Sequence, residues 1–185
     1  MEISKDHFIA GVIGGVASLF LAMAARNVMF KHRRGKWMRN RQQSEVVTMN
    51  SDNMPAAIGP YSKGKLIKLQ DGSSMAYSSG QLGLDPKTNE LISDDVEEQA
   101  HQVIKNLKAL AEDNGMTLQD TVKNVVYLVD MADFAKVNEV YKKYYSAEYP
   151  ARTCIAIKAL PKGGKVEIES VFFKAAEKKG CCAGH

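Results

Sequence analysis

Residues 94–115 have the sequence DDVEEQAHQVIKNLKALAEDNG, in which apolar side chains recur at the spacing of one helical face. Asp94 or Asp95 can cap the first turn of this helix, and Asn114-Gly115 can end it. The face that we expect to be buried is formed by Val96, Ala100, Val103, Leu107, Leu110 and Ala111. The segment therefore predicts one amphipathic helix in the middle of a folded domain.

Predicted strands lie on both sides of this helix: residues 65–70, 75–79, 122–129, 153–160 and 165–174. Asp71-Gly72-Ser73-Ser74 is typical of a hairpin loop, and Pro161-Lys162-Gly163-Gly164 is predicted to join the last two strands as a second hairpin. A second amphipathic helix is predicted over residues 132–145. Its buried face is formed by Phe134, Val137, Val140 and Tyr141. The order of hairpin, helix, strand, helix and hairpin predicts an α+β fold with two helices on one face of a mixed sheet.

The opposite face of this sheet needs a cover of its own. In the strand Lys165-Val166-Glu167-Ile168-Glu169, both carboxylates point to the same face, because side chains alternate along a strand. A lone domain would expose these carboxylates to water, whereas a second subunit would close over them. We therefore expect the domain to oligomerise.

Charge divides the chain of 185 residues into two unequal parts. Residues 1–43 carry eight Lys or Arg and two acids, a net charge of +6, so the total of +4 leaves −2 for the rest. The C-terminal domain is therefore mildly acidic, and its sequence has no stripe of basic and aromatic residues. Nucleic-acid binding by this domain is accordingly the weakest of the functions considered.

The N-terminal part contains a candidate membrane anchor. Phe8 to Ala25, FIAGVIGGVASLFLAMAA, is uncharged and spans roughly 27 Å as a helix, near the thickness of a bilayer core. Residues 31–41 carry six Lys or Arg and no acid, which predicts a single-pass anchor with the C-terminal domain on the cytosolic or matrix side. The mitochondrial inner membrane is the favoured location and the endoplasmic reticulum is the alternative.

The sequence thus predicts four segments: a transmembrane anchor at 1–30, a basic arm and linker at 31–53, a folded domain at 54–174 and a C-terminal tail at 175–185. The three cysteines, Cys154 and the adjacent Cys181-Cys182, form neither a disulfide framework nor the spacing of a metal site. The four histidines are scattered as well. We expect no metal and no cofactor.

Six motifs occur in order along the domain: Pro55–Ser62, Ser79-Gly80-Gln81, Leu84–Thr88, Asp133–Tyr141, Pro150-Ala151-Arg152, and Leu160–Gly163 followed by Val166–Glu169. Together they resemble the Rid/YjgF family of reactive-intermediate deaminases over about residues 50–174. The resemblance implies a chorismate-mutase-like fold, a homotrimer or a Rid-like heterotrimer with clefts between subunits, and hydrolysis of 2-enamino or 2-imino acids to 2-keto acids and ammonia. The chain would then be a 2-iminobutanoate/2-iminopropanoate deaminase.

The resemblance also implies roles for individual residues. Arg152 would bind the substrate carboxylate, a role that suits the planar fork of a guanidinium. Glu167 would orient a water molecule and accept its proton, which is sufficient for attack on an electrophilic imine carbon. The other expected site residues are Tyr61, closing the cleft, Ser79 and Gly80, binding substrate, Cys154, offering a backbone group, and Asn138, at the cleft rim.

Three classes of function remain open on the sequence. The first is a membrane-tethered imine deaminase, which the presence of Arg152, Glu167, Tyr61 and Ser79 favours. The second is an accessory subunit of a membrane complex, favoured by small residues that recur along the apolar run and would allow close helix packing. The third is RNA cleavage or translation inhibition, which the acidic charge of the domain disfavours.

Overall fold

The computed structural model describes residues 44–145 and 148–177. The predicted anchor at Phe8 to Ala25, the basic arm and Cys181-Cys182 lie outside these residues. Within the described ranges, no helix combines the length and the apolar character needed to cross a membrane.

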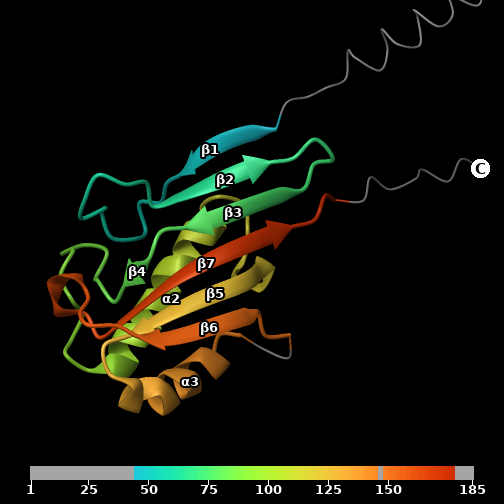
Figure 1. Ribbon diagram of the computed structural model, residues 1–185. Helices are drawn as coiled ribbons and strands as arrows, with labels where there is room; N and C mark the ends of the chain where they lie inside the picture. Colours follow the sequence, from blue (N-terminus) through green and yellow to red (C-terminus); the bar gives the residue numbers. More distant parts are fainter. Residues whose placement is uncertain (1–43, 146–147, 178–185) are drawn as a thin grey trace, which may run out of the picture. The chain divides into compact units, whose positions relative to one another are not determined.

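The described residues form one mixed sheet with two helices on one of its faces (Figure 1). Its strands are β1 Glu45–Met49, β2 Gly64–Lys68, β3 Ser74–Ser78, β4 Gln81–Leu82, β5 Thr121–Leu128, β6 Ala151–Ala156 and β7 Val166–Lys174. The strand order is β1-β2-β3-β7-β5-β6, with β4 also paired to β7. The helices are α2 Val96–Glu112 and α3 Phe134–Lys142. Short 3-10 turns occupy Leu118–Asp120, Met131–Asp133 and Pro161–Gly163. The predicted α+β architecture is therefore confirmed.

Helix α2 begins and packs as its sequence predicts. Asp95 is the N-cap, and its carboxylate accepts hydrogen bonds from the backbone of Glu97 and Glu98 at 2.8 and 3.0 Å. All six residues of the expected face are buried. Val96, Ala100, Val103 and Leu107 pack with α3 and the inner side of β5 and β7 into the main hydrophobic core, whereas Leu110 and Ala111 pack into a second core cluster.

One correction concerns residues 44–53, which the sequence predicted to be a linker. Glu45–Met49 instead forms β1, an edge strand paired antiparallel with β2. Met49 is fully buried and belongs to a second core cluster with Phe172. Only Val47 and Met49 of this short strand point inward, so two apolar positions were too few to reveal an alternating pattern.

A second correction concerns the predicted C-terminal hairpin. β6 and β7 are not paired with each other, because β5 lies between them and pairs parallel with β6 and antiparallel with β7. Helix α3 connects β5 to β6, and a strand–helix–strand crossover of this kind gives parallel neighbours. β6 also ends at Ala156 rather than at residue 160.

A third correction concerns Phe134, which was expected in the core but is 38% exposed. Its ring lies 5.5 Å from the Arg152 guanidinium carbon instead. The other three predicted core residues of α3 are buried. The first residue of the helix therefore contributes to a surface beside Arg152 rather than to the core.

The sheet face without helices is partly apolar. Along β7, Val166, Ile168, Ser170 and Phe172 are buried, and the residues between them point to the opposite face. Glu167 and Glu169 are therefore on the open face, as predicted. Apolar side chains exposed there include Tyr77, Ile155 and Phe173, at 42–44% exposure.

Candidate functional site

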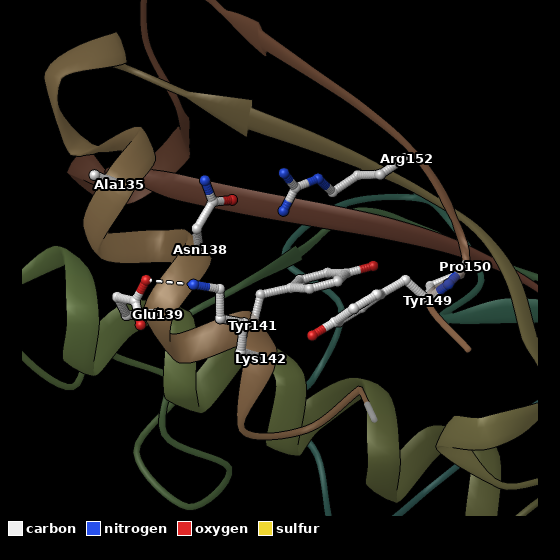
Figure 2. Close-up of a pocket in the computed structure, with 8 residues that line it drawn as sticks. All are labelled: Ala135, Asn138, Glu139, Tyr141, Lys142, Tyr149, Pro150 and Arg152. Atoms are coloured by element: carbon white, nitrogen blue, oxygen red, sulfur yellow. Dashed lines mark hydrogen bonds and ion pairs between the residues drawn. The ribbon is translucent and has the colours of Figure 1, made fainter. Parts of the chain in front are cut away.

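A cavity of about 430 Å³ opens between α3 and the start of β6. It is lined by Ala135, Asn138, Glu139, Tyr141, Lys142, Tyr149, Pro150 and Arg152. Two of the seven predicted site residues, Arg152 and Asn138, therefore share one cavity. Figure 2 shows the Asn138 amide and the Arg152 guanidinium directed toward each other across it.

The Arg152 guanidinium is held by aromatic rings rather than by an acid. Its carbon lies 4.9 Å from the centre of the Tyr141 ring and 5.5 Å from that of Phe134. All five ion pairs among the described residues use lysine, so Arg152 has no carboxylate partner within those residues. Its planar N–H donors are available to an anionic ligand.

The other charges of the cavity largely neutralise each other. Lys142 and Glu139, one turn apart on α3, form an ion pair of 2.7 Å at the exposed rim (Figure 2). Among the described residues that line this cavity, Arg152 is therefore the cation without an acidic partner, and its charge suits an anionic ligand.

Glu167 lies elsewhere, on the open face of the sheet, where β7 pairs with β4. Its carboxylate covers Gly80: a Cβ atom on that glycine would lie 2.6 Å from Glu167 Cδ. Burial raises the pKa of the Glu167 carboxyl above its ordinary value of 4.5, and the neighbouring Glu169 raises it further. A carboxylate with a raised pKa is a stronger base, which suits the predicted role in proton transfer.

Tyr61 and Ser79 lie near Gly80 in the chain's fold. Tyr61 is 46% exposed, and its hydroxyl accepts a hydrogen bond of 3.3 Å from the backbone of Ile58. With Gly80 it lines a shallow hollow formed by residues 54–58 and the start of β4. The Ser79 hydroxyl donates to the Ser62 carbonyl at 2.7 Å, so it fixes the loop that carries Tyr61.

Cys154 follows Arg152 by two positions on β6 and points to the same side of the strand. It packs against the main core, and burial raises the pKa of its thiol. A thiol that stays protonated is a poor nucleophile.

Among the described residues, no cluster of three or more His, Cys, Asp or Glu is placed to hold a metal ion.

The predicted site residues thus form two groups on one chain. Arg152, Cys154 and Asn138 lie on the helix-covered side at the β6 edge. Glu167, Gly80, Tyr61 and Ser79 lie around β4 and the open face. A single chain places Arg152 and Glu167 on opposite faces of the sheet, so each group is half of a possible site.

Sequence reasoning missed the aromatic support of Arg152. It assigned Tyr141 and Phe134 only to the core, and it gave no role to Tyr149, which stacks near Tyr141 with ring centres 6.5 Å apart. One signal was present. Phe134 and Tyr141 are seven residues apart, which places both on the same side of α3.

Comparisons with known proteins agree with this fold. The family model described as Endoribonuclease L-PSP matches residues 51–173. RutC family protein y4sK of Sinorhizobium fredii is 48% identical over 127 residues, which are 69% of this chain and 97% of that protein. The human protein named 2-iminobutanoate/2-iminopropanoate deaminase is 42% identical over 117 residues, or 63% of this chain and 82% of that protein.

Solved structures give the same result. RidA from an Antarctic Psychrobacter matches with a TM-score of 0.63 and 45% identity, covering 69% of this chain and 99% of that one. The YjgF gene product of E. coli matches with a TM-score of 0.62 and 39% identity, covering 70% of this chain and 99% of that one. With motifs, fold and family model in agreement, the chain belongs to the Rid/YjgF family, whose family model is described as Endoribonuclease L-PSP.

Proposed function

We propose that this protein hydrolyses 2-imino acids, and the enamines in equilibrium with them, to 2-keto acids and ammonia. The observation that carries the proposal is the Arg152 guanidinium, which lines an open cavity without an acidic partner among the described residues. Relatives that are named 2-iminobutanoate/2-iminopropanoate deaminase in human and in Salmonella typhimurium, each 42% identical, support the choice of substrate.

The chemistry requires one cation and one base. Arg152 binds the substrate carboxylate through two parallel hydrogen bonds, which fixes the position of the adjacent imine carbon. Glu167 accepts a proton from water as the water oxygen bonds to that carbon. Glu167 passes that proton to the imine nitrogen, which gives an amino alcohol. Glu167 then takes the proton of the new hydroxyl group and delivers it to the nitrogen as the C–N bond breaks, so ammonia leaves and the 2-keto acid remains.

We further propose that the working site forms between subunits of a trimer. Arg152 and Glu167 are on opposite faces of the sheet, so one chain does not bring them to the same substrate. The partly apolar open face, with Tyr77, Ile155 and Phe173 exposed, supports an assembly in which a neighbouring subunit covers it. Arg152 of one subunit would then face Glu167 of the next.

The direct test is ammonia release from freshly generated 2-iminobutanoate by the purified full-length chain, with molar mass measured in parallel. A trimer that accelerates release above the uncatalysed rate supports the proposal. A folded trimer that leaves the rate unchanged would contradict it and would favour the accessory-subunit function.

The pH dependence offers a test of Glu167. The base must be deprotonated, so the rate should fall as pH drops through the pKa of Glu167, which burial and Glu169 hold above 4.5. Replacing Glu169 with Gln removes the smaller of these two causes. The pKa of Glu167 should then decrease, and the acid limb of the kcat/KM profile should move to lower pH.

The matched control is Glu139→Gln, which removes an exposed carboxylate from the rim of the Arg152 cavity instead. Its acid limb should coincide with that of the wild type. An acid limb that does not move in Glu169→Gln would show that another group controls the profile.

A further inference from the structure

We infer that Asn124 and Tyr141 are positioning residues that hold the Arg152 guanidinium in its carboxylate-binding orientation. The inference rests on the proposed function of Arg152 and adds to it a buried chain of hydrogen bonds. These hydrogen bonds start in the strands β7 and β5 and end at the Tyr141 ring, which lies against the Arg152 guanidinium.

The hydrogen bonds begin at Ser170 on β7. The Ser170 hydroxyl donates to Asn124 Oδ1 at 2.5 Å, and Asn124 Nδ2 donates to the Tyr141 hydroxyl at 2.7 Å. The three side chains are 2%, 0% and 4% exposed, respectively. Because both ends of the buried Asn124 amide are hydrogen-bonded, the amide has one favourable orientation, and it fixes the phenol end of Tyr141.

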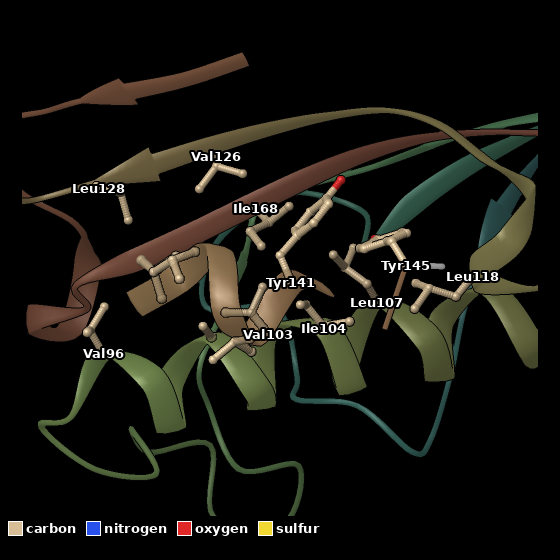
Figure 3. Packing of buried hydrophobic residues seen from close by; sticks show 14 residues of the cluster. Val96, Val103, Ile104, Leu107, Leu118, Val126, Leu128, Tyr141, Tyr145 and Ile168 are labelled. Atoms are coloured by element: carbon tan, nitrogen blue, oxygen red, sulfur yellow. The ribbon is translucent and has the colours of Figure 1, made fainter. Parts of the chain in front are cut away.

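The Tyr141 ring is fixed along its length as well. Tyr145 stacks on it with ring centres 4.3 Å apart and an angle of 27° between planes, and Figure 3 shows the two rings side by side beneath the sheet. Burial raises the pKa of Tyr141, so the phenol stays neutral at physiological pH. The ring is therefore an uncharged platform of defined orientation.

Arg152 depends on this platform for its position. Its guanidinium carbon is 4.9 Å from the centre of the Tyr141 ring, and no ion pair with a described residue competes for it. An acidic partner would occupy the N–H donors, whereas an aromatic ring orients the guanidinium plane and leaves those donors free. The Asn124 amide therefore influences carboxylate binding without touching the ligand.

Two variants of Tyr141 separate the hydroxyl from the ring. Tyr141→Phe keeps the ring but removes the hydroxyl that is hydrogen-bonded to Asn124. We expect the Kd for 2-oxobutanoate to rise about fivefold, while kcat for 2-iminobutanoate changes less than about twofold. Tyr141→Leu removes the ring too, and the Kd should rise by roughly tenfold or more. Asn124→Leu, of similar shape to Asn but without donor or acceptor, should reproduce the Tyr141→Phe effect.

The matched control is Tyr144→Phe. It deletes another hydrogen-bonded phenol three residues further along, which contacts His101 Nδ1 at 2.9 Å and not Arg152. A general loss of packing would weaken binding in both Phe variants, whereas a positioning effect appears in Tyr141→Phe alone. The NMR signal of Arg152 Nε–H gives an independent readout, because the Tyr141 ring current should shift it upfield and the shift should decrease in Tyr141→Phe.

The outcomes distinguish this inference from the proposed function. Equal 2-oxobutanoate affinity in Tyr141→Phe and the wild type, with an unchanged Arg152 signal, overturns the inference even if the wild type hydrolyses imines. Weakened binding in Tyr141→Phe with no hydrolysis by the wild type supports the inference and overturns the proposed reaction. A wild type that binds no 2-oxobutanoate overturns both.

Discussion

Arg152→Ala is expected to lower kcat/KM for 2-iminobutanoate by a factor of about 10²–10³, because the proposed binding mode would lose two charge-assisted hydrogen bonds to the substrate carboxylate. Thermal stability should stay near that of the wild type. The guanidinium lines an open cavity, and its removal leaves no carboxylate among the described residues without an ion-pair partner. Steady-state ammonia release, together with a thermal unfolding curve, measures both quantities.

Two further variants sharpen this result. Arg152→Lys keeps the positive charge but not the planar fork, so its kcat/KM should stay well below that of the wild type. Lys142→Ala removes a cation that lines the same cavity and is 56% exposed in its pair with Glu139, and it should act almost as the wild type does. Equal losses in Arg152→Ala and Lys142→Ala would indicate a general effect of charge rather than a specific carboxylate site.

Mixing two inactive variants tests whether the site is shared between subunits. Arg152→Ala and Glu167→Gln, unfolded together and refolded, should regain on the order of a quarter of the wild-type activity. Each site needs Arg152 from one subunit and Glu167 from the next, and in an equal mixture each of these residues is intact in half of the subunits. About one site in four is therefore complete. Mixtures that stay as inactive as the separate variants would place both residues in one subunit's site and contradict the proposed assembly.

The parts of the fold that the sequence predicted are those with a local signal. Helix α2 shows six apolar residues at helical spacing and a capping Asp95, and the β2–β3 hairpin has a turn-rich loop, so both were found with nearly correct ends. The pairing of β6 was missed because the Pro161–Gly163 turn suggests a hairpin locally. The partner of a strand is decided instead by the crossover through α3, which is not a local property.

The sequence motifs predicted a set of site residues but not how these residues are arranged in space. Strand alternation placed Glu167 and Glu169 on one face correctly, and the motifs pointed to Arg152 and Asn138, which share a cavity. The sequence pattern did not specify the strand order β7-β5-β6. Because this order decides which residues share a face, it could not be predicted that Arg152 and Glu167 lie on opposite faces of the sheet. The support of Arg152 by Tyr141 was missed because a buried tyrosine on a helix is accounted for by the core alone.

Gly80→Ala is expected to reduce kcat by about a hundredfold while leaving the fold almost as stable as the wild type. A Cβ atom at this position would lie 2.6 Å from Glu167 Cδ and 3.0 Å from Glu167 Cγ, so the carboxylate must move away. These atoms are the end of a flexible side chain, and Gly80 has no positive φ, so the backbone accepts alanine at little cost. In the proposed reaction, however, the displaced carboxylate would no longer reach the attacking water, and general base catalysis is typically worth 10²–10⁴-fold.

Gly83→Ala is expected to have the opposite effects: it should lower stability and leave kcat unchanged. Its Cβ would lie 2.7 Å from Gln99 Cα and 2.9 Å from the Gln99 carbonyl oxygen, which belong to the backbone of α2 and do not yield without moving the helix. This variant should lose roughly 1–3 kcal/mol of unfolding free energy, while the molecules that remain folded keep their kcat. The two glycines are three residues apart, so opposite effects on kcat and on the melting temperature would show that Gly80 acts through Glu167 rather than through the stability of β4. A Gly80→Ala protein with wild-type kcat would remove Glu167, in its present position, from the reaction.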